Sequence, residues 1–130
     1  MNLKNLIEAV YSTVKQSRTD IFAEYDKAPV NSHAGIYAVT GIEEIRLDNQ
    51  FMKGDLKRYE TEIDLKVRVL GLPGEDPLNL YDFLDSNILS SLTSSGYYLV
   101  SAKISAPAQD HGLNRLVLEG KITLKAGSEA

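Results

Sequence analysis

The spacing of apolar residues along the chain changes from a helical period to a strand period. From Leu3 to Val14 these residues recur three or four positions apart, which predicts a helix with one apolar face. From Tyr59 to Val69, apolar residues and Thr61 alternate with charged residues, which predicts a strand with one buried and one wet face. The same reasoning predicts strands over residues 34–47, 97–106 and 115–125, and a short strand over residues 21–25.

A second helix is predicted between the central strand and the last two strands. Asp76-Pro77 has the residue types of an N-cap and a first helical position, and Gly96 is expected to end the helix. The order of elements favours an α+β class, with a twisted, mostly antiparallel sheet of four to five strands and two helices packed on one face. In the strand after Gly96, alternation predicts one shared face for Tyr98, Val100, Ala102, Ile104 and Ala106.

The composition fits one folded domain. The chain has 130 residues, which predicts a single domain over residues 1–130 with a loose tail at 127–130. Apolar residues make up 43% and charged residues 25%, a balance that argues against disorder. The N-terminal pattern is neither that of a signal peptide nor that of a membrane span. We therefore expect a cytoplasmic site of synthesis and no membrane partner.

Charge and cysteine content exclude several kinds of function. The formal net charge is −4, which disfavours sequence-specific nucleic-acid binding because neutralising phosphates requires a basic surface. The chain has no cysteine, so disulfides, thiolate nucleophiles and cysteine-ligated zinc are excluded.

Few residues have the arrangement that catalysis or metal binding requires. Asp110-His111 lacks a metal-ligand spacing, and we interpret it as a solvated histidine beside a turn aspartate. Gly71-x-x-Gly74 lacks the Gly-Lys-Ser/Thr of a phosphate-binding loop. No serine lies in a nucleophile elbow. The sequence thus predicts no catalytic residue, no metal and no cofactor.

Three segments are candidates for contact with another protein. Phe51, Met52 and Lys53 lie in a polar connection at an expected hairpin tip, where Phe51 and Met52 either fold back on the domain or touch a partner. Of Tyr97 and Tyr98, one is expected to face the helices and the other to be exposed, and we take Tyr97 as a candidate contact. The turn containing Asp110 and His111 is the third candidate.

The layout resembles that of phage-type tail terminator (tail-completion) proteins, including those of phage-tail-like particles. The resemblance covers nearly the whole chain, from the Leu3–Val14 helix to the Ile122–Leu124 strand. Three stretches carry it: the charged alternating strand of residues 59–69, Pro77–Leu84 opening the second helix, and the two-strand finish around Asp110–Arg115. The family is recognised by the order of its elements rather than by a sharp motif.

The resemblance implies an assembly protein rather than an enzyme. It implies a homo-oligomeric ring, commonly a hexamer, that docks on the last ring of the tail tube protein and meets the neck or connector protein. The resemblance leaves open whether the sheath of a contractile tail is a further partner. The implied location is a virion or a phage-tail-like particle assembled in the bacterial cytoplasm, and the family has no catalytic residues to carry over.

Two other functions remain open from the sequence. One is a small α+β ligand-binding module with a pocket between sheet and helices, lined by Tyr37, Tyr81 and Tyr98. The other is a metal-dependent or acid–base enzyme that uses Asp110 and His111.

Overall fold

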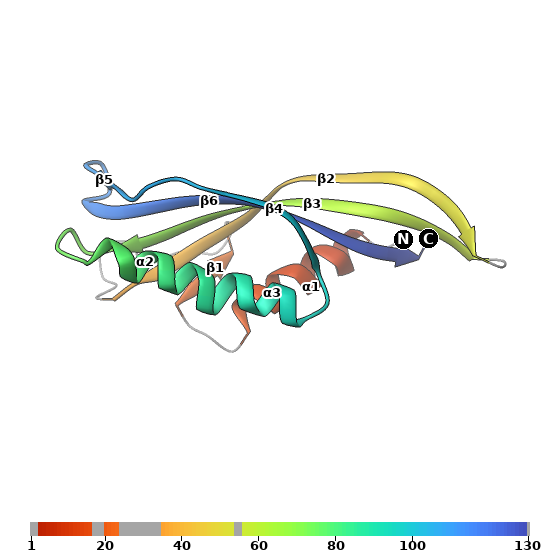
Figure 1. The fold of residues 1–130 in the computed structure, drawn as a ribbon, viewed down its shortest axis with the longest axis horizontal. Coiled ribbons are helices and arrows are strands. Elements are labelled where there is room, and N and C mark those ends of the chain that lie inside the picture. The colour runs from red at the N-terminus through yellow and green to blue at the C-terminus, as the bar shows by residue number, and fades with distance from the viewer. Residues whose placement is uncertain (1–2, 17–19, 24–34, 54–55, 130) are drawn as a thin grey trace.

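The computed structural model describes residues 3–16, 20–23, 35–53 and 56–129, with the backbone alone for 48–53, 56–60 and 126–129 (Figure 1). The order of elements is α1 (Leu3–Lys15), β1 (Ile21–Ala23), β2 (Tyr37–Lys53), β3 (Leu56–Gly71), α2 (Pro77–Phe83), η1 (Leu84–Leu89), α3 (Ser90–Ser94), β4 (Tyr98–Ile104), β5 (Ala108–Asp110) and β6 (Arg115–Glu129).

The described strands form one sheet in the order β1-β2-β3-β6-β4, and β5 pairs with β6 beside this path. β1 and β2 are parallel, and the other pairs are antiparallel. The predicted α+β class is confirmed, although the sheet has six strands instead of four to five. The additional strand, β5, lies between the strands predicted over residues 97–106 and 115–125, because residues 108–110 fold back along β6.

Both helical segments lie on the same face of the sheet, and its other face is open (Figure 1). The core between them follows the alternation predicted for residues 59–69 over the side chains that are described, since Thr61, Ile63, Leu65, Val67 and Val69 are all buried. β3 and β6 pair without a register shift, so that Leu65 faces Ile122 and Ile63 faces Leu124. The fully buried apolar side chains of this layer are Val10, Val14, Ala38, Ile63, Leu65, Val67, Val69, Leu80, Ile88, Leu92, Leu118, Ile122 and Leu124.

A π-helical turn, η1, joins α2 to α3, so the three segments form one continuous helix. The buried positions of this continuous helix, Leu80, Leu84, Ile88 and Leu92, recur every four residues. An α-helix repeats every ~3.6 residues, so such a stripe would drift around it. The wider π turn, with hydrogen bonds from i to i+5, keeps these residues on the face toward the sheet.

Both ends of this helix have the predicted caps. The Asp76 carboxylate accepts a hydrogen bond from the Leu78 N–H at 3.0 Å, and Pro77 occupies the first turn. At the other end, Gly96 has a φ of +91°, which a residue with a Cβ adopts only under strain. The Tyr97 N–H then donates to the Leu92 carbonyl at 3.2 Å and closes the helix.

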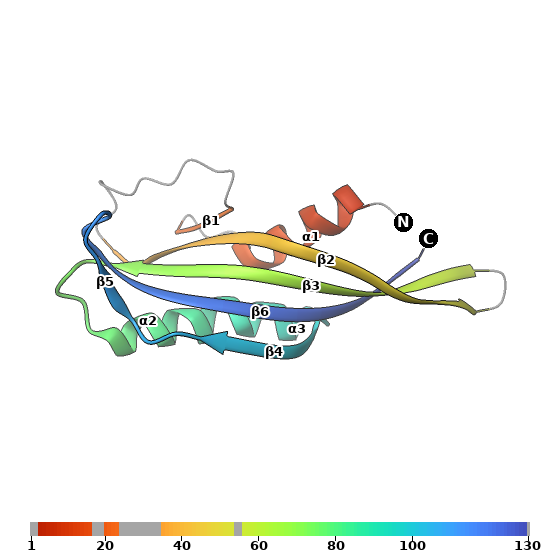
Figure 2. The same ribbon diagram turned by 90° about the horizontal axis from the view of Figure 1, so that it is seen from above.

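The β2–β3 hairpin is longer than the sequence predicted. β2 was expected to end near residue 48, with Phe51 and Met52 in a connecting loop. Instead, β2 continues to Lys53, and Phe51 lies opposite Arg58 in β3 after a register shift. These strands, with the end of β6 beside them, extend past α1 and α3 (Figures 1 and 2).

The C-terminal segment, predicted as a loose tail at 127–130, is mostly part of the sheet. β6 continues to Glu129, which lies opposite Arg58 of β3. The reason is the longer β3, whose additional residues supply backbone partners to the end of β6. Residue 130 lies outside the described residues.

Candidate functional site

Tyr97 and Tyr98 have the opposite roles to those predicted. Tyr97 is half-buried and packs against the core, whereas Tyr98 is 70% exposed. Tyr97, the predicted contact residue, is therefore a core residue, and the exposed tyrosine of the pair is its neighbour.

A β-bulge in β4 explains this difference. Leu99 lies opposite Leu124 of β6 and Ser101 lies opposite Thr123, so Val100 is an extra residue in the ladder. Directly opposite residues of antiparallel strands point to the same face, and Leu99 therefore points toward the helices with Leu124. Tyr98 therefore does not share a face with Ala102 and Ile104, which follow the bulge, although the sequence predicted that it would.

Asp110 and His111 lie at the turn between β5 and β6. Asp110 Oδ1 accepts a hydrogen bond from the Leu113 N–H at 3.0 Å, so its carboxylate stabilises the turn. His111 is exposed. Within the described residues no group of three or more His, Cys, Asp or Glu side chains is placed to hold a metal ion. A role of this turn in contact with a partner stays a prediction.

Phe51, Met52 and Lys53 belong to the end of β2, opposite residues 56–58 of β3. Their side chains, and the residues that join the two strands, lie outside the described part of the chain. The structure therefore corrects the element that carries these three candidates and leaves their contact role a prediction.

The three tyrosines proposed to line a ligand pocket are not brought together. Tyr37 is fully buried in a second apolar cluster with Leu70 and Val117, and Arg115 lies 5.9 Å from its ring centre. Tyr81 is 37% exposed on α2. A cleft of about 340 Å³ lies between α1 and the edge of the sheet instead, and it is lined by Glu8, Tyr11, Ser12, Lys15, Gln16, Ala23 and Thr40.

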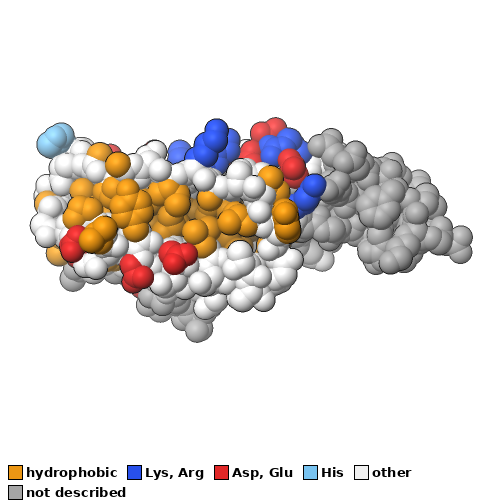
Figure 3. Space-filling model, in the orientation of Figure 1, with side chains coloured by type: hydrophobic (Ala, Val, Ile, Leu, Met, Phe, Trp, Pro, Cys, Tyr) orange, Lys and Arg blue, Asp and Glu red, His pale blue; other side chains and the backbone are white. Residues whose placement is uncertain are grey.

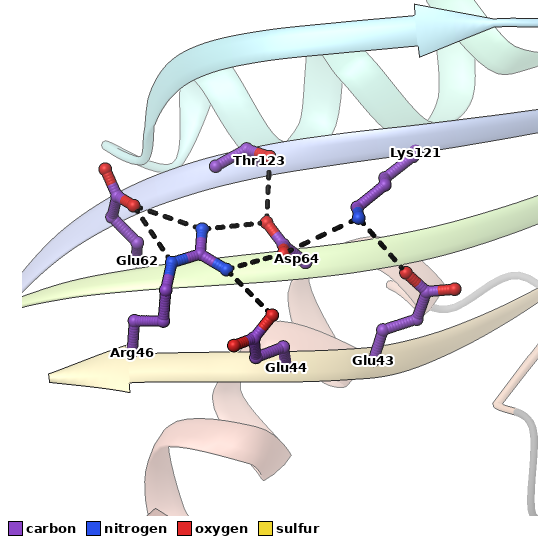
Figure 4. A network of polar contacts seen from close by, with 7 residues as sticks. All are labelled: Glu43, Glu44, Arg46, Glu62, Asp64, Lys121 and Thr123. Carbon is purple, nitrogen blue, oxygen red and sulfur yellow. Dashed lines mark hydrogen bonds and ion pairs between the residues drawn. The ribbon is translucent and has the colours of Figure 1, made fainter.

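A network of charged side chains lies on the open face of the sheet (Figure 4). Its centre is Asp64 on β3, which is 3% exposed although alternation places it on the wet face. The Arg46 guanidinium on β2 donates hydrogen bonds to both carboxylate oxygens of Asp64, from Nη1 to Oδ2 at 2.6 Å and from Nη2 to Oδ1 at 3.1 Å. Thr123 on β6 donates to Oδ1 at 2.8 Å. Asp64 thus links the three neighbouring strands.

The strand register produces this network. Arg46 lies opposite Glu62, and its Nη2 lies 3.1 Å from Glu62 Oε2. Asp64 lies opposite Thr123. Lys121 completes the cluster, with its Nζ 3.8 Å from Asp64 Oδ2 and 3.6 Å from Glu43 Oε2. The sequence showed only alternating charges, and the signal that was missed is this cross-strand pairing of opposite signs.

The electrostatics of the cluster keep Asp64 ionised. The hydrogen bond from Arg46 lowers the pKa of Asp64 from 3.8 to about 2, with a further contribution from the Thr123 hydroxyl against the opposing effect of burial. The same contacts, first of all the hydrogen bond to Asp64, raise the pKa of Arg46. Both groups stay charged at neutral pH. Their arrangement suits a strand clamp, since each charge is already engaged by a partner.

The second notable surface lies at the β4 edge of the sheet. Among the described residues eight large apolar side chains are exposed, and five of them are on α2 or β4: Leu78, Tyr81, Tyr98, Val100 and Ile104. β4 is the last strand of the sheet order, so one side of its backbone has no strand partner in the described chain. Figure 3 shows hydrophobic side chains gathered in a band over this edge.

Comparison with known proteins leaves the chain without an assigned family. A scan against protein-family models finds no match, and a search of curated proteins finds none either. In the described residues no helix has both the length and the apolar character needed to cross a membrane.

Proposed function

We propose that this chain is a structural assembly protein that caps the end of a phage or phage-tail-like tube as a ring of identical subunits. In this role the ring ends tube growth and joins the tube to the neck. Its partners are copies of itself, the tail tube protein and the neck or connector protein. The subunit acts by binding, so no residue is assigned a catalytic role.

The order of elements supports the proposal. A helix, two long strands, a second helix and two further strands follow each other as the resemblance to tail terminators requires. The three stretches that carry the resemblance correspond to β3, to the start of α2, and to the β5–β6 hairpin. This support concerns the fold, and many functions share one fold.

The observation that carries the proposal is the β2–β3 arm, which we define as residues 48–53 and 56–60. Its two strands remain paired beyond the part of the sheet that α1 and α3 cover (Figure 2). A closed ring needs a feature of one subunit that contacts a different surface on the next. An arm that leaves the body meets this need, because it reaches a neighbouring subunit or the tube without unfolding the core.

A capping assay tests the proposed function. Purified chain is mixed with purified tubes of its own tail tube protein, and the tube ends are imaged by negative-stain electron microscopy. The proposal predicts a terminal ring and an end to further tube growth when more tube protein is added. Continued elongation, with the chain left unbound, would reject it.

A further inference from the structure

The β4 edge presents a surface with an apolar centre and two charged borders. We define the edge surface as Leu78, Tyr81 and Asp85 on the helix with Val100, Lys103 and Ile104 on β4. Leu78 is 70% exposed, Val100 44% and Ile104 41%. Side-chain atoms of Ile104 and of Leu84 on the helix both lie within 4 Å of the Cβ position of Gly120, so Ile104 points to the helix side of the sheet.

The helix flank that borders this band is acidic. Tyr81 and Asp85 are one turn apart and share a flank, to which Leu78 and Asp82 also belong. The opposite flank, with Asn87 and Ser91, faces Gln16 of α1. The flank with Asp85 is therefore the one that faces the β4 edge, and Asp85 is exposed there.

The sheet border of the band is basic. Lys103 on β4 lies directly opposite Lys121 on β6, so both point to the open face of the sheet. Lys121 has Glu43 and Asp64 as partners, whereas no ion pair involves Lys103 among the described residues. In Figure 3, Lys and Arg side chains border the band above, with acidic ones among them toward the grey end, and Asp and Glu side chains border it below.

We propose that the edge surface binds the same surface of a second copy of this chain around a two-fold axis parallel to β4. Rotation about that axis places the helix border of one copy against the sheet border of the other. Asp85 then approaches Lys103 of the second copy twice, once on each side of the axis. The apolar bands meet between these contacts and are removed from water together.

Charge complementarity selects this arrangement over a continuous sheet across two β4 strands. In a continuous sheet the two-fold axis is perpendicular to the sheet, so the acidic helix border of one copy meets the acidic border of the other, and the basic borders meet likewise. Like charges placed directly opposite are unfavourable. A two-fold contact also closes on itself and forms a pair, whereas a ring needs a different contact. The two-fold dimer and the proposed ring are therefore independent proposals, and either one can be rejected without the other.

Sedimentation equilibrium of purified chain, from micromolar to submillimolar concentration, tests this contact. We expect a monomer–dimer equilibrium for the wild type. Asp85→Lys and Lys103→Glu each make both contacts repulsive and should raise the dissociation constant about tenfold. The double variant Asp85→Lys/Lys103→Glu reverses both borders and should return it to near the wild-type value.

Each other outcome overturns the proposal. A wild-type monomer at every concentration excludes the contact, and a ring without a dimer assigns self-association to another surface. A dimer that both single variants leave unchanged favours the continuous sheet, and a double variant without rescue removes the charge argument. Leu78→Ser should also weaken the dimer. Leu3→Ser, at an apolar residue 45% exposed on α1, is its matched control and should not. Circular dichroism verifies that each variant is folded.

Discussion

Arg46 and Asp64 form a two-point ion pair between β2 and β3, with both guanidinium Nη atoms on the two carboxylate oxygens at 2.6 and 3.1 Å. Such paired contacts are stronger and more directional than a single charged contact. The pair lies on the open face of the sheet, where none of the described helices packs on the strands (Figure 1). It therefore helps to fix the register of the hairpin whose far end forms the arm.

Asp64→Asn should lower the free energy of unfolding at pH 7 by about 1–3 kcal/mol, because Arg46 and Thr123 lose a charged partner that is itself only 3% exposed. Urea unfolding followed by circular dichroism measures the change. Glu8→Gln, at an exposed carboxylate on α1, is the control and should stay within about 0.5 kcal/mol of wild type. Equal losses in both variants would assign the effect to net charge.

The stability contributed by Asp64 should depend on pH in a defined window. Folding lowers the pKa of this carboxyl from 3.8 to about 2. A depressed pKa stabilises the folded state above the unfolded value and loses this effect as the pH falls through the folded value. The difference between wild type and Asp64→Asn should therefore be full above about pH 4 and shrink toward pH 2. A difference that stays constant from pH 7 to pH 2 would contradict the pairing.

Shortening the arm should separate assembly from folding. Replacing residues 50–58 with an Asn-Gly turn keeps β2 and β3 paired up to Asp48 and Glu60. We expect the variant to fold, since the buried core lies outside the removed segment, but to lose capping of tubes in the microscopy assay. Normal capping by the shortened chain would exclude the arm as a docking element.

Gly96→Ala should destabilise the chain by about 1–2 kcal/mol, because the φ of +91° is unfavourable for a residue with a Cβ. Gly74→Ala is the matched control, since a Cβ there meets no atom within 4 Å. Thermal unfolding of the two variants compares them directly. If the two melting temperatures fall equally, the helix end is not the cause.

Asp76→Ala should cost about 0.5–2 kcal/mol through loss of the hydrogen bond from the Leu78 N–H. Asp76→Ser keeps a side-chain acceptor at the N-cap and should retain most of the wild-type stability. Chemical unfolding of both variants tests this, and an unstable serine variant would point to the charge instead.

The sequence predicted elements that depend on local chemistry. Asp76-Pro77 and Gly96 were recognised as caps because capping acts within a few residues. The alternation in β3 was recognised because one of its faces meets water. What was missed depends on pairing between distant segments. The bulge at Val100 arises from the fit of β4 to β6 and has no composition signal, so it reversed the roles of Tyr97 and Tyr98.

In the candidate site, too, the features that the sequence did not predict depend on pairing between strands. Asp64 was interpreted as one of several solvent-exposed charged residues. Its burial depends on contacts with Arg46 and Thr123, which lie on other strands. Phe51 and Met52 were assigned to a loop because polar residues surround them, whereas continued pairing with residues 57 and 58 extends the strand. Pairing between strands, rather than the local sequence, therefore decided each of these positions.

The most direct test of the proposed role is negative-stain electron microscopy of particles assembled with and without the gene for this chain. The account predicts that its absence gives tubes of uncontrolled length, or headless tails without a terminal ring, and that supplying the chain in trans restores normal particles. Normal tails and joined heads in its absence would contradict the account.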